Sequence, residues 1–287
     1  PLRGQNIKTN HLCAGNFLGI LVQQEFGERL QIGGALFGIR PFPMPAQGEA
    51  RHQGNIKVAK HQAVKLGEDH KAGQDKQMPY IPYINGKMDR PDGGIEVGNY
   101  KYTSSLTDQT VKITVPSPTM THFRGGREAI DLETYPTMDE FFADMARLYR
   151  EELADLYTAG CRYVQFDDTN LAYLCDENMR ENARALGEDP DELPETYAAL
   201  INASIKDRPD DMAVCIHLCR GNAKSQWFAS GGYEPVAEKL FNLTEVDGFF
   251  LEYDDERSGG FEPLRFVPKG NKNIVLGLIT TKRGELE

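Results

Sequence analysis

The sequence has no long apolar run, few cysteines for its length and fewer basic than acidic residues. No apolar stretch among its 287 residues approaches the ~20 that a membrane-spanning helix needs, and its first residues show no signal-peptide pattern. Five cysteines do not make a disulfide framework in a chain of this size; they fit a reducing compartment, where Cys and His more often bind metal or take part in catalysis. The net charge of −11 argues against a nucleic-acid backbone as partner. We therefore expect a cytoplasmic protein that binds neither a membrane nor a nucleic acid.

Residues 1–77 differ from the remainder of the chain in charge and in pattern. They carry ten Lys/Arg and six Asp/Glu, whereas residues 78–287 carry 22 and 37. They are also rich in Gln and Gly, and only residues 17–26 are apolar enough for a short helix or strand. We leave residues 1–77 unassigned, with three alternatives open: a poorly ordered tail, a translation artefact or retained non-coding sequence, or unrecognised strand–helix units. A chain that begins with Pro1 is expected to be a fragment or a processed product.

Short apolar runs alternate with helix patterns throughout residues 78–287. Each run is followed at once by polar residues, which is typical of buried parallel strands whose carboxyl ends open into loops. The predicted strands span residues 112–115, 163–166, 213–219, 248–252 and 274–280. The predicted helices span residues 177–186, 194–206 and 235–240, together with a longer one that begins at the capping box of Thr137 and Glu140 and ends at Gly160.

This alternation predicts an α/β fold with parallel strands. Polar residues at the strand ends favour a (β/α)8 TIM barrel, whose active site lies at the carboxyl-terminal face of the strands. An open doubly wound sheet is the competing architecture, but no Gly-rich phosphate loop follows any strand, which disfavours a dinucleotide-binding fold. Five strands of eight are recognisable, so we expect an incomplete barrel whose exposed sheet edges lower its stability.

The segment Cys215-Ile-His-Leu-Cys219 carries the strongest chemical signal. Alternate side chains of a strand share a face, so Cys215, His217 and Cys219 point one way and the apolar residues between them point the other. An imidazole and a thiolate on one face suit tetrahedral zinc. A His-x-Cys pattern is weak by itself, because a hydrogen-bonded core histidine beside inert buried cysteines gives the same pattern.

Two acidic residues at neighbouring strand ends strengthen the signal. Glu252 closes the next apolar run, and a buried glutamate needs a cation or an arginine partner. Arg257 is the alternative partner that would make Glu252 purely structural. Asp167 ends the preceding strand and is predicted to point inward, although it could instead cap the loop that follows.

The order of these strand ends resembles the catalytic domain of cobalamin-independent methionine synthase, and in particular its shorter, single-barrel relatives. The resemblance covers roughly residues 78–287 and rests on several motifs in order. These motifs are Val-Pro-Ser-Pro-Thr-Met (115–120), His-Phe-Arg-Gly-Gly (122–126), Tyr-Val-Gln-Phe-Asp-Asp (163–168), Asp-Asp-Thr-Asn-Leu-Ala-Tyr-Leu (167–174), Ile-His-Leu-Cys-Arg (216–220) and Phe-Leu-Glu (250–252).

The resemblance implies a (β/α)8 barrel of the uroporphyrinogen decarboxylase and methionine synthase superfamily. The family binds zinc through His, Cys, Glu and a second Cys, and His217, Cys219 and Glu252 match the first three. Asp167 matches the carboxylate that holds the amino group of homocysteine. The implied reaction transfers the N5-methyl group of methyltetrahydropteroylglutamate, a methyltetrahydrofolate-type donor, to the thiol of homocysteine or a similar thiol.

Some parts of the family pattern have no counterpart here. The fourth ligand, a Cys on the last strand, is absent before Glu287, and Cys215 lies one strand position deeper than the ligands, so we do not expect it to substitute. The catalytic histidine of the strand before the last is also absent, and Thr281 or Lys282 occupies that region. The motifs of the first two barrel strands are not recognisable in residues 1–77.

An acid must protonate the departing amine nitrogen, and Asp168 and Lys282 are the candidates. Three alternatives remain open. The chain could be an enzyme with another methyl donor or thiol acceptor, such as a corrinoid-linked methyltransferase, or a decarboxylase of the same superfamily. It could also be an inactive barrel fragment that at most binds zinc.

Overall fold

The computed structural model describes residues 56–59, 81–222, 227–270, 272–280, 282 and 284. The apolar run at residues 17–26, most of the unassigned segment and Thr281 therefore lie outside the described residues. One strand of the unassigned segment is described: β1 (Ile56–Ala59). It pairs antiparallel with β2 (Ile81–Ile84), which follows that segment.

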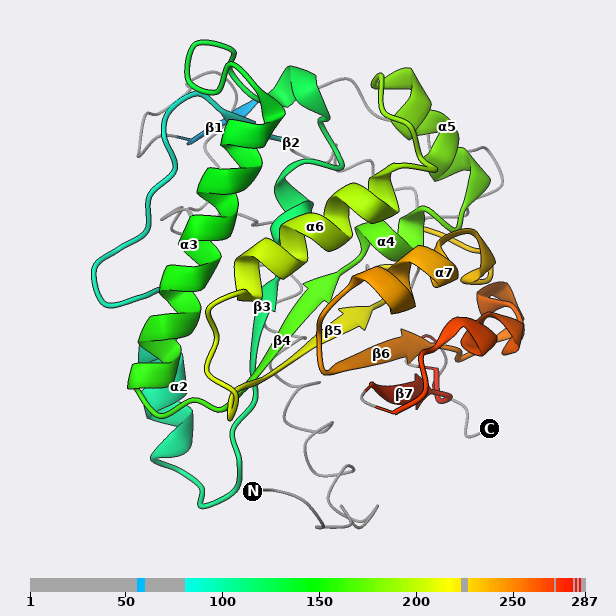
Figure 1. Cartoon of the computed structure of the whole chain (residues 1–287). Helices are drawn as coiled ribbons and strands as arrows, with labels where there is room; N and C mark the ends of the chain where they lie inside the picture. The colour runs from blue at the N-terminus through cyan, green and yellow to red at the C-terminus, as the bar shows by residue number, and fades with distance from the viewer. Residues whose placement is uncertain are drawn as a thin grey trace.

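A sheet of five parallel strands forms the centre of the described structure (Figure 1). Its strands are β3 (Ile113–Pro116), β4 (Tyr163–Asp168), β5 (Ala213–Leu218), β6 (Gly248–Glu252) and β7 (Asn273–Gly277). They lie in the sheet in the same order as in the chain, and each neighbouring pair is parallel. All five predicted strands are confirmed, with small shifts at their ends. The largest shift is in β7, which ends three residues before the predicted boundary at Thr280.

Three helices lie side by side on one face of this sheet (Figure 1). They are α3 (Met138–Thr158), α6 (Leu193–Ile205) and α7 (Glu234–Leu243); α3 packs against α6, and α6 packs against α7. A doubly wound sheet would carry helices on both faces and would not keep its strands in chain order. The described residues therefore form an open part of a (β/α)8 barrel with the helices outside, as the sequence predicts.

The alternation of side chains along the strands separates a dry face from a polar one. The residues that point toward the helices are almost completely buried: Val164, Phe166, Val214, Ile216, Phe249 and Leu251 are at most 2% exposed. On the other face, Asp167, His217 and Phe250 are half-buried, while Gln165 and Cys215 are 7% exposed. That face is the inside of the barrel, because helices cover the opposite one.

The ends of α3 follow from local sequence. The hydroxyl oxygen of Thr137 accepts a hydrogen bond from the N–H of Glu140. Two acidic residues in the first turn stabilise the helix by interacting with the positive end of its dipole. Gly160 adopts a φ of 104° directly after the helix, a conformation that favours glycine. The predicted start and end of this helix are thus confirmed.

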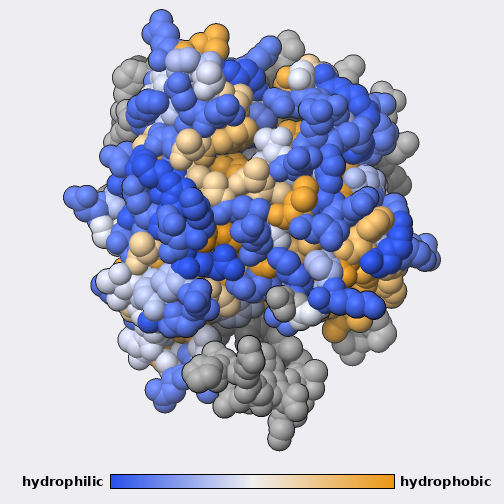
Figure 2. Space-filling view, in the orientation of Figure 1, coloured by the Kyte–Doolittle hydropathy of each residue, from blue (hydrophilic) through white to orange (hydrophobic). Residues whose placement is uncertain are grey.

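Shorter elements cover the two ends of the sheet. They are α2 (Val97–Ser104), α4 (Asn170–Tyr173), α5 (Glu177–Ala185) and the 3-10 turns η3 (Pro118–Thr121), η4 (Arg127–Ala129), η5 (Glu256–Ser258) and η6 (Glu262–Phe266). None of the helices in the described part of the chain is long and apolar enough to cross a membrane. Figure 2 shows the helical side of the molecule, where hydrophilic residues dominate and apolar residues gather in a band across the middle.

Candidate metal centre

The carboxyl ends of β4, β5 and β6 bring the predicted site residues to one edge of the sheet. Asp167 of β4 lies directly beside His217 of β5, and His217 lies beside Phe250 of β6. Cys219 follows β5 by one residue, and Glu252 is the last residue of β6. The inner face of the strands therefore carries an imidazole, a thiol and two carboxylates.

His217 is the electrostatic centre of this group. Burial alone would lower the pKa of His217, but the nearby thiol of Cys219 and the carboxylates of Asp167 and Glu252 together raise that pKa to about 9. A pKa above neutrality favours the protonated imidazole. Because a histidine must be neutral to bind a metal, metal binding at His217 would release that proton.

Glu252 is held by three donors. Its carboxylate accepts hydrogen bonds from the backbone N–H of Arg220 at 2.7 Å, from the ammonium group of Lys282 at 2.9 Å and from the guanidinium group of Arg257. The alternative partner considered for Glu252, Arg257, is thus its partner in the structure. Lys282 is also ion-paired with Asp254 at 3.4 Å. Burial would raise the pKa of Asp254, but Arg257 and Lys282 lower it to about 2.

The donor set suits zinc in its chemistry. Cys219 and Glu252 both lie close enough to His217 to raise the pKa of its imidazole. Among the described residues, however, no three His, Cys, Asp or Glu side chains converge as they would around a metal. Glu252 must therefore exchange its cationic partners for the metal before these residues can form the predicted site.

Asp167 faces the inside of the barrel, as predicted for a substrate-binding residue. Its carboxylate accepts a hydrogen bond at 2.6 Å from the amide of Gln165, whose oxygen accepts one at 2.7 Å from the ammonium group of Lys112. Burial raises the pKa of Asp167, although the nearby His217, Gln165 and Lys112 partly oppose the change. Asp167 does not cap the following loop; its neighbour Asp168 does.

Asp168, predicted as a candidate acid, points to the opposite face of β4. It is completely buried, and its carboxylate accepts hydrogen bonds from the hydroxyl of Thr119 at 2.7 Å and the N–H of Leu171 at 2.9 Å. Burial raises its pKa, while these hydrogen bonds lower it. This geometry gives Asp168 a structural task, fixing the start of α4. Of the two predicted acids, only Lys282 lies beside the other site residues.

Sequence reasoning assigned no role to Tyr173, which lies near the thiol of Cys219, or to Arg124, which lies near Tyr173. Burial raises the pKa of Tyr173; the Arg124 guanidinium lowers it and the sulfur of Cys219 raises it, so the phenol lies near both groups. Both residues belong to motifs that resemble the methionine synthase family, at residues 122–126 and 167–174. Those motifs were the only signal for them in the sequence.

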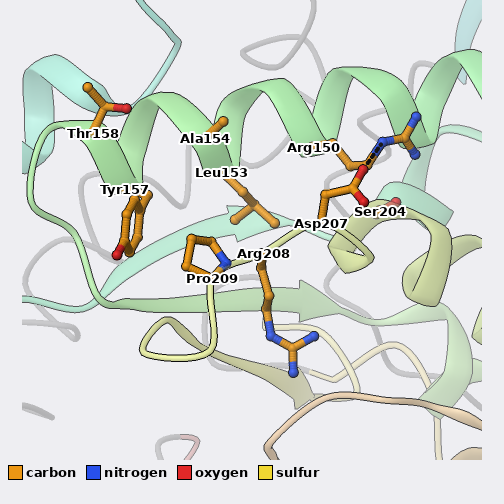
Figure 3. Close-up of a pocket in the computed structure, with 9 residues that line it drawn as sticks. All are labelled: Arg150, Leu153, Ala154, Tyr157, Thr158, Ser204, Asp207, Arg208 and Pro209. Atoms are coloured by element: carbon orange, nitrogen blue, oxygen red, sulfur yellow. Dashed lines mark ion pairs between the residues drawn. The ribbon is translucent and has the colours of Figure 1, made fainter.

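A groove of about 200 Å³ lies at the other end of the strands, between α3 and the connection that leads into β5 (Figure 3). Its charged groups are already paired. Arg150 lies 3.5 Å from Asp207, and Arg208 donates to both carboxylate oxygens of Asp247 at 3.3 Å. We assign no function to this groove, because its arginines hold the loop before β5 in place.

Comparison with known proteins gives relatives without an established activity. No family model matches the chain. The chain is 46% identical over 205 residues to the uncharacterised YxjH of Bacillus subtilis (strain 168), covering 71% of this chain and 53% of YxjH. It is 45% identical over 191 residues to the uncharacterised YxjG of the same organism, covering 66% of this chain and 50% of YxjG. The chain thus spans about half the length of the curated relatives it matches.

Two solved structures are similar to this one. One, from Listeria monocytogenes, is provisionally named a vitamin-B12-independent methionine synthase; it is 40% identical with a TM-score of 0.58, over 72% of this chain and 58% of that chain. The other is a B12-independent methionine synthase from Shewanella sp. W3-18-1 in complex with selenomethionine. It is 19% identical with a TM-score of 0.57, over 81% of this chain and 61% of that chain, and it supports the fold alone. Both structural neighbours thus bear the name of the family that the sequence resembles.

Proposed function

We propose that this chain carries the zinc-binding part of a methyltransferase of the cobalamin-independent methionine synthase type. The thiol acceptor would be homocysteine or a similar thiol, and the donor a methyltetrahydrofolate-type molecule. The observation that carries the proposal is the placement of His217 and Cys219 at the end of β5 on the inner face of the barrel, beside Asp167 of β4 and Glu252 of β6. The name of the structural neighbour from Listeria monocytogenes supports the same reaction class.

His217, Cys219 and Glu252 would hold the zinc ion, which when bound keeps the acceptor sulfur in its reactive thiolate form. The fourth ligand is not identified among the described residues. Cys215 is a poor substitute, because burial raises the pKa of its thiol to about 11 and it lies one strand position deeper. A substrate sulfur or a residue outside the described part of the chain would complete the coordination.

The remaining residues have binding and proton-handling tasks. The Asp167 carboxylate, oriented by Gln165, would accept hydrogen bonds from the ammonium group of an amino-acid thiol. Arg124, which lies near Tyr173, would supply a positive charge that suits a carboxylate of either substrate. Lys282 is the remaining candidate for protonating the departing amine nitrogen, since its ammonium group lies within hydrogen-bonding distance of Glu252.

A matched pair of cysteine variants tests the proposal. Cys219→Ser should lose stoichiometric zinc and methyl transfer to homocysteine together, whereas Cys215→Ser should keep both. Metal analysis of the purified protein and a methyl-transfer assay with methyltetrahydrofolate measure the two properties. Stoichiometric zinc in the Cys219→Ser variant would exclude the ligand assignment.

The second candidate is a chain that binds zinc without turnover. The ion pairs that hold Glu252 and the open barrel of the described residues favour it. Zinc in the wild type that depends on Cys219, without methyl transfer from either a folate or a methylcorrinoid donor, would support this candidate. Transfer from the corrinoid alone would identify another methyl donor for the same site.

A further inference from the structure

Arg257 is the principal counter-ion of Glu252. Its guanidinium group contacts the Glu252 carboxylate and also pairs with Asp254 at 2.9 Å and with Asp255. The side chain is only 8% exposed. One buried cation therefore lies between three carboxylates at the carboxyl end of β6.

The guanidinium group of Arg257 also stacks on Trp227, 4.7 Å from the centre of the ring. Trp227 is the single tryptophan of the chain and comes from the loop between β5 and α7. Any displacement of Arg257 would change the surroundings of this ring. The tryptophan fluorescence of the chain therefore comes from a ring that contacts Arg257.

The hydrogen bonding around Glu252 is incomplete. Two arginines contact its carboxylate, Arg220 through the backbone and Arg257 through the side chain, and each keeps a buried Nε–H group without an acceptor. A buried donor without a partner costs free energy. The ion-paired arrangement therefore leaves two buried donors beside Glu252 unsatisfied.

We propose that Arg257 acts on the site through Glu252. Its guanidinium group pairs with the Glu252 carboxylate where a divalent cation would bind, and this competition limits the affinity of the site for zinc. This inference rests on the proposed function, because it takes Glu252 as a metal ligand. Zinc binding would move the guanidinium group off Glu252 while Asp254 and Asp255 retain it. The charge of Arg257 is then still paired, so the exchange does not leave a buried unpaired cation.

Lys282 is less suited to this task. Its ammonium group is a point charge on a flexible stem, and it contacts Glu252 and Asp254 but not Asp255. The planar guanidinium group of Arg257 spans all three carboxylates and is fixed from the side by Trp227. Arg257 is therefore the cation that zinc must displace from Glu252.

Zinc affinity of metal-stripped protein, measured by competition with a chelator and by metal analysis, tests the proposal. Arg257→Gln removes the competing charge and should bind zinc about tenfold more tightly or better, while Arg257→Lys keeps the charge and should stay within about threefold of the wild type. Arg265→Gln is the matched control, because Arg265 also pairs with a carboxylate, Glu234, and stacks on an aromatic ring, Phe266. It should leave zinc affinity unchanged.

Fluorescence gives a second readout that needs no change at Arg257. As zinc fills the wild-type site, the emission of Trp227 should shift with the same half-saturation as metal binding. Glu252→Gln should abolish the shift. This titration decides the question even if Arg257→Gln fails to fold.

The outcomes separate the inference from the proposed function. A wild type that binds no zinc overturns both. Zinc that depends on Cys219, with unchanged affinity in a folded Arg257→Gln variant and unchanged Trp227 emission in the wild type, overturns only the role of Arg257. Tighter zinc binding by Arg257→Gln, or a Trp227 shift that follows zinc and requires Glu252, supports that role.

Discussion

The hydroxyl group of Tyr233 accepts a hydrogen bond from the backbone N–H of Glu252 at 2.9 Å. The same hydroxyl donates to the carbonyl oxygen of Leu218 at 2.9 Å and accepts from the side chain of Arg220 at 3.1 Å. Leu218 ends β5 and Glu252 ends β6, so one phenol joins the two strand ends that carry the predicted metal ligands. Its donor and both acceptor positions are used.

Tyr233→Phe should therefore destabilise the fold and weaken the metal site. The substitution leaves the buried N–H of Glu252 and the carbonyl of Leu218 without a partner, which should lower the free energy of unfolding by about 1–3 kcal/mol. Urea denaturation measures this loss, and zinc competition measures the effect on the site. Tyr253→Phe is the control, because the buried hydroxyl of Tyr253 has no hydrogen-bond partner, so its removal should be neutral or stabilising.

The two aspartates at the end of β4 should respond differently to substitution. Asp168→Ala removes the acceptor for Thr119 and Leu171 in a completely buried position, and should cost about 2–4 kcal/mol of unfolding free energy. Burial raises the pKa of Asp167, so its ionised form opposes folding at neutral pH, and Asp167→Asn should be neutral or stabilising. Asp167→Asn should instead weaken the binding of homocysteine, as measured by calorimetry. Equal destabilisation by both substitutions would contradict their placement on opposite faces of β4.

Acid should remove a stabilising contact between His122 and Glu188. The hydrogen bond from His122 to Glu188, 3.3 Å long, lowers the pKa of this carboxylate below its usual value of 4.5. Because folding lowers the pKa of this carboxylate, the stabilisation is fully present at pH values above 4.5. It disappears as the pH falls through the lower pKa of Glu188 in the folded state.

The Glu188→Gln variant should accordingly be about 1 kcal/mol less stable than the wild type at pH 7, and the difference should vanish in acid. Urea unfolding at a series of pH values measures it. Glu234→Gln serves as the control, because its ion pair with Arg265 lies in solvent and should contribute far less. A Glu188→Gln deficit that is constant with pH would point to lost packing instead of the lost charge.

Gly231 should tolerate no side chain. Its φ is 111°, and a Cβ atom there would lie 2.2 Å from the carbonyl oxygen of Cys175. Gly231→Ala should lower the unfolding free energy by about 2–4 kcal/mol and weaken zinc binding, because the carbonyl of Gly231 also holds the side chain of Arg220. Gly270→Ala meets the same backbone strain, with a φ of 120°, but no neighbouring atom within 4 Å. The difference between the two melting temperatures isolates the steric contact.

Local signals in the sequence were sufficient for the sheet and for the face on which the site lies. The capping box at Thr137, the glycine at 160 and the alternation in residues 213–219 depend on neighbours a few positions apart, and all were predicted correctly. The same alternation, applied to residues 163–168, would have placed Asp168 on the dry face.

The contacts that the sequence did not reveal join distant segments. The phenol of Tyr233 reaches back to Leu218 and forward to Glu252, and Arg124 reaches Tyr173 across an intervening strand and helix. The pairing of β1 with β2 places Ile56 opposite Ile84. The sequence between these two strands shows no periodic pattern that would predict the pairing. No rule of spacing predicts such pairs, because the connecting loops determine them.

The order of the strands has a consequence for synthesis of the protein. Each of the strands β4 to β7 pairs with the strand that precedes it in the chain, so its partner has already left the ribosome when it emerges. The sheet from β3 to β7 can then grow one strand–helix unit at a time. A pause in translation anywhere between β3 and β7 would leave a shorter but correctly paired sheet.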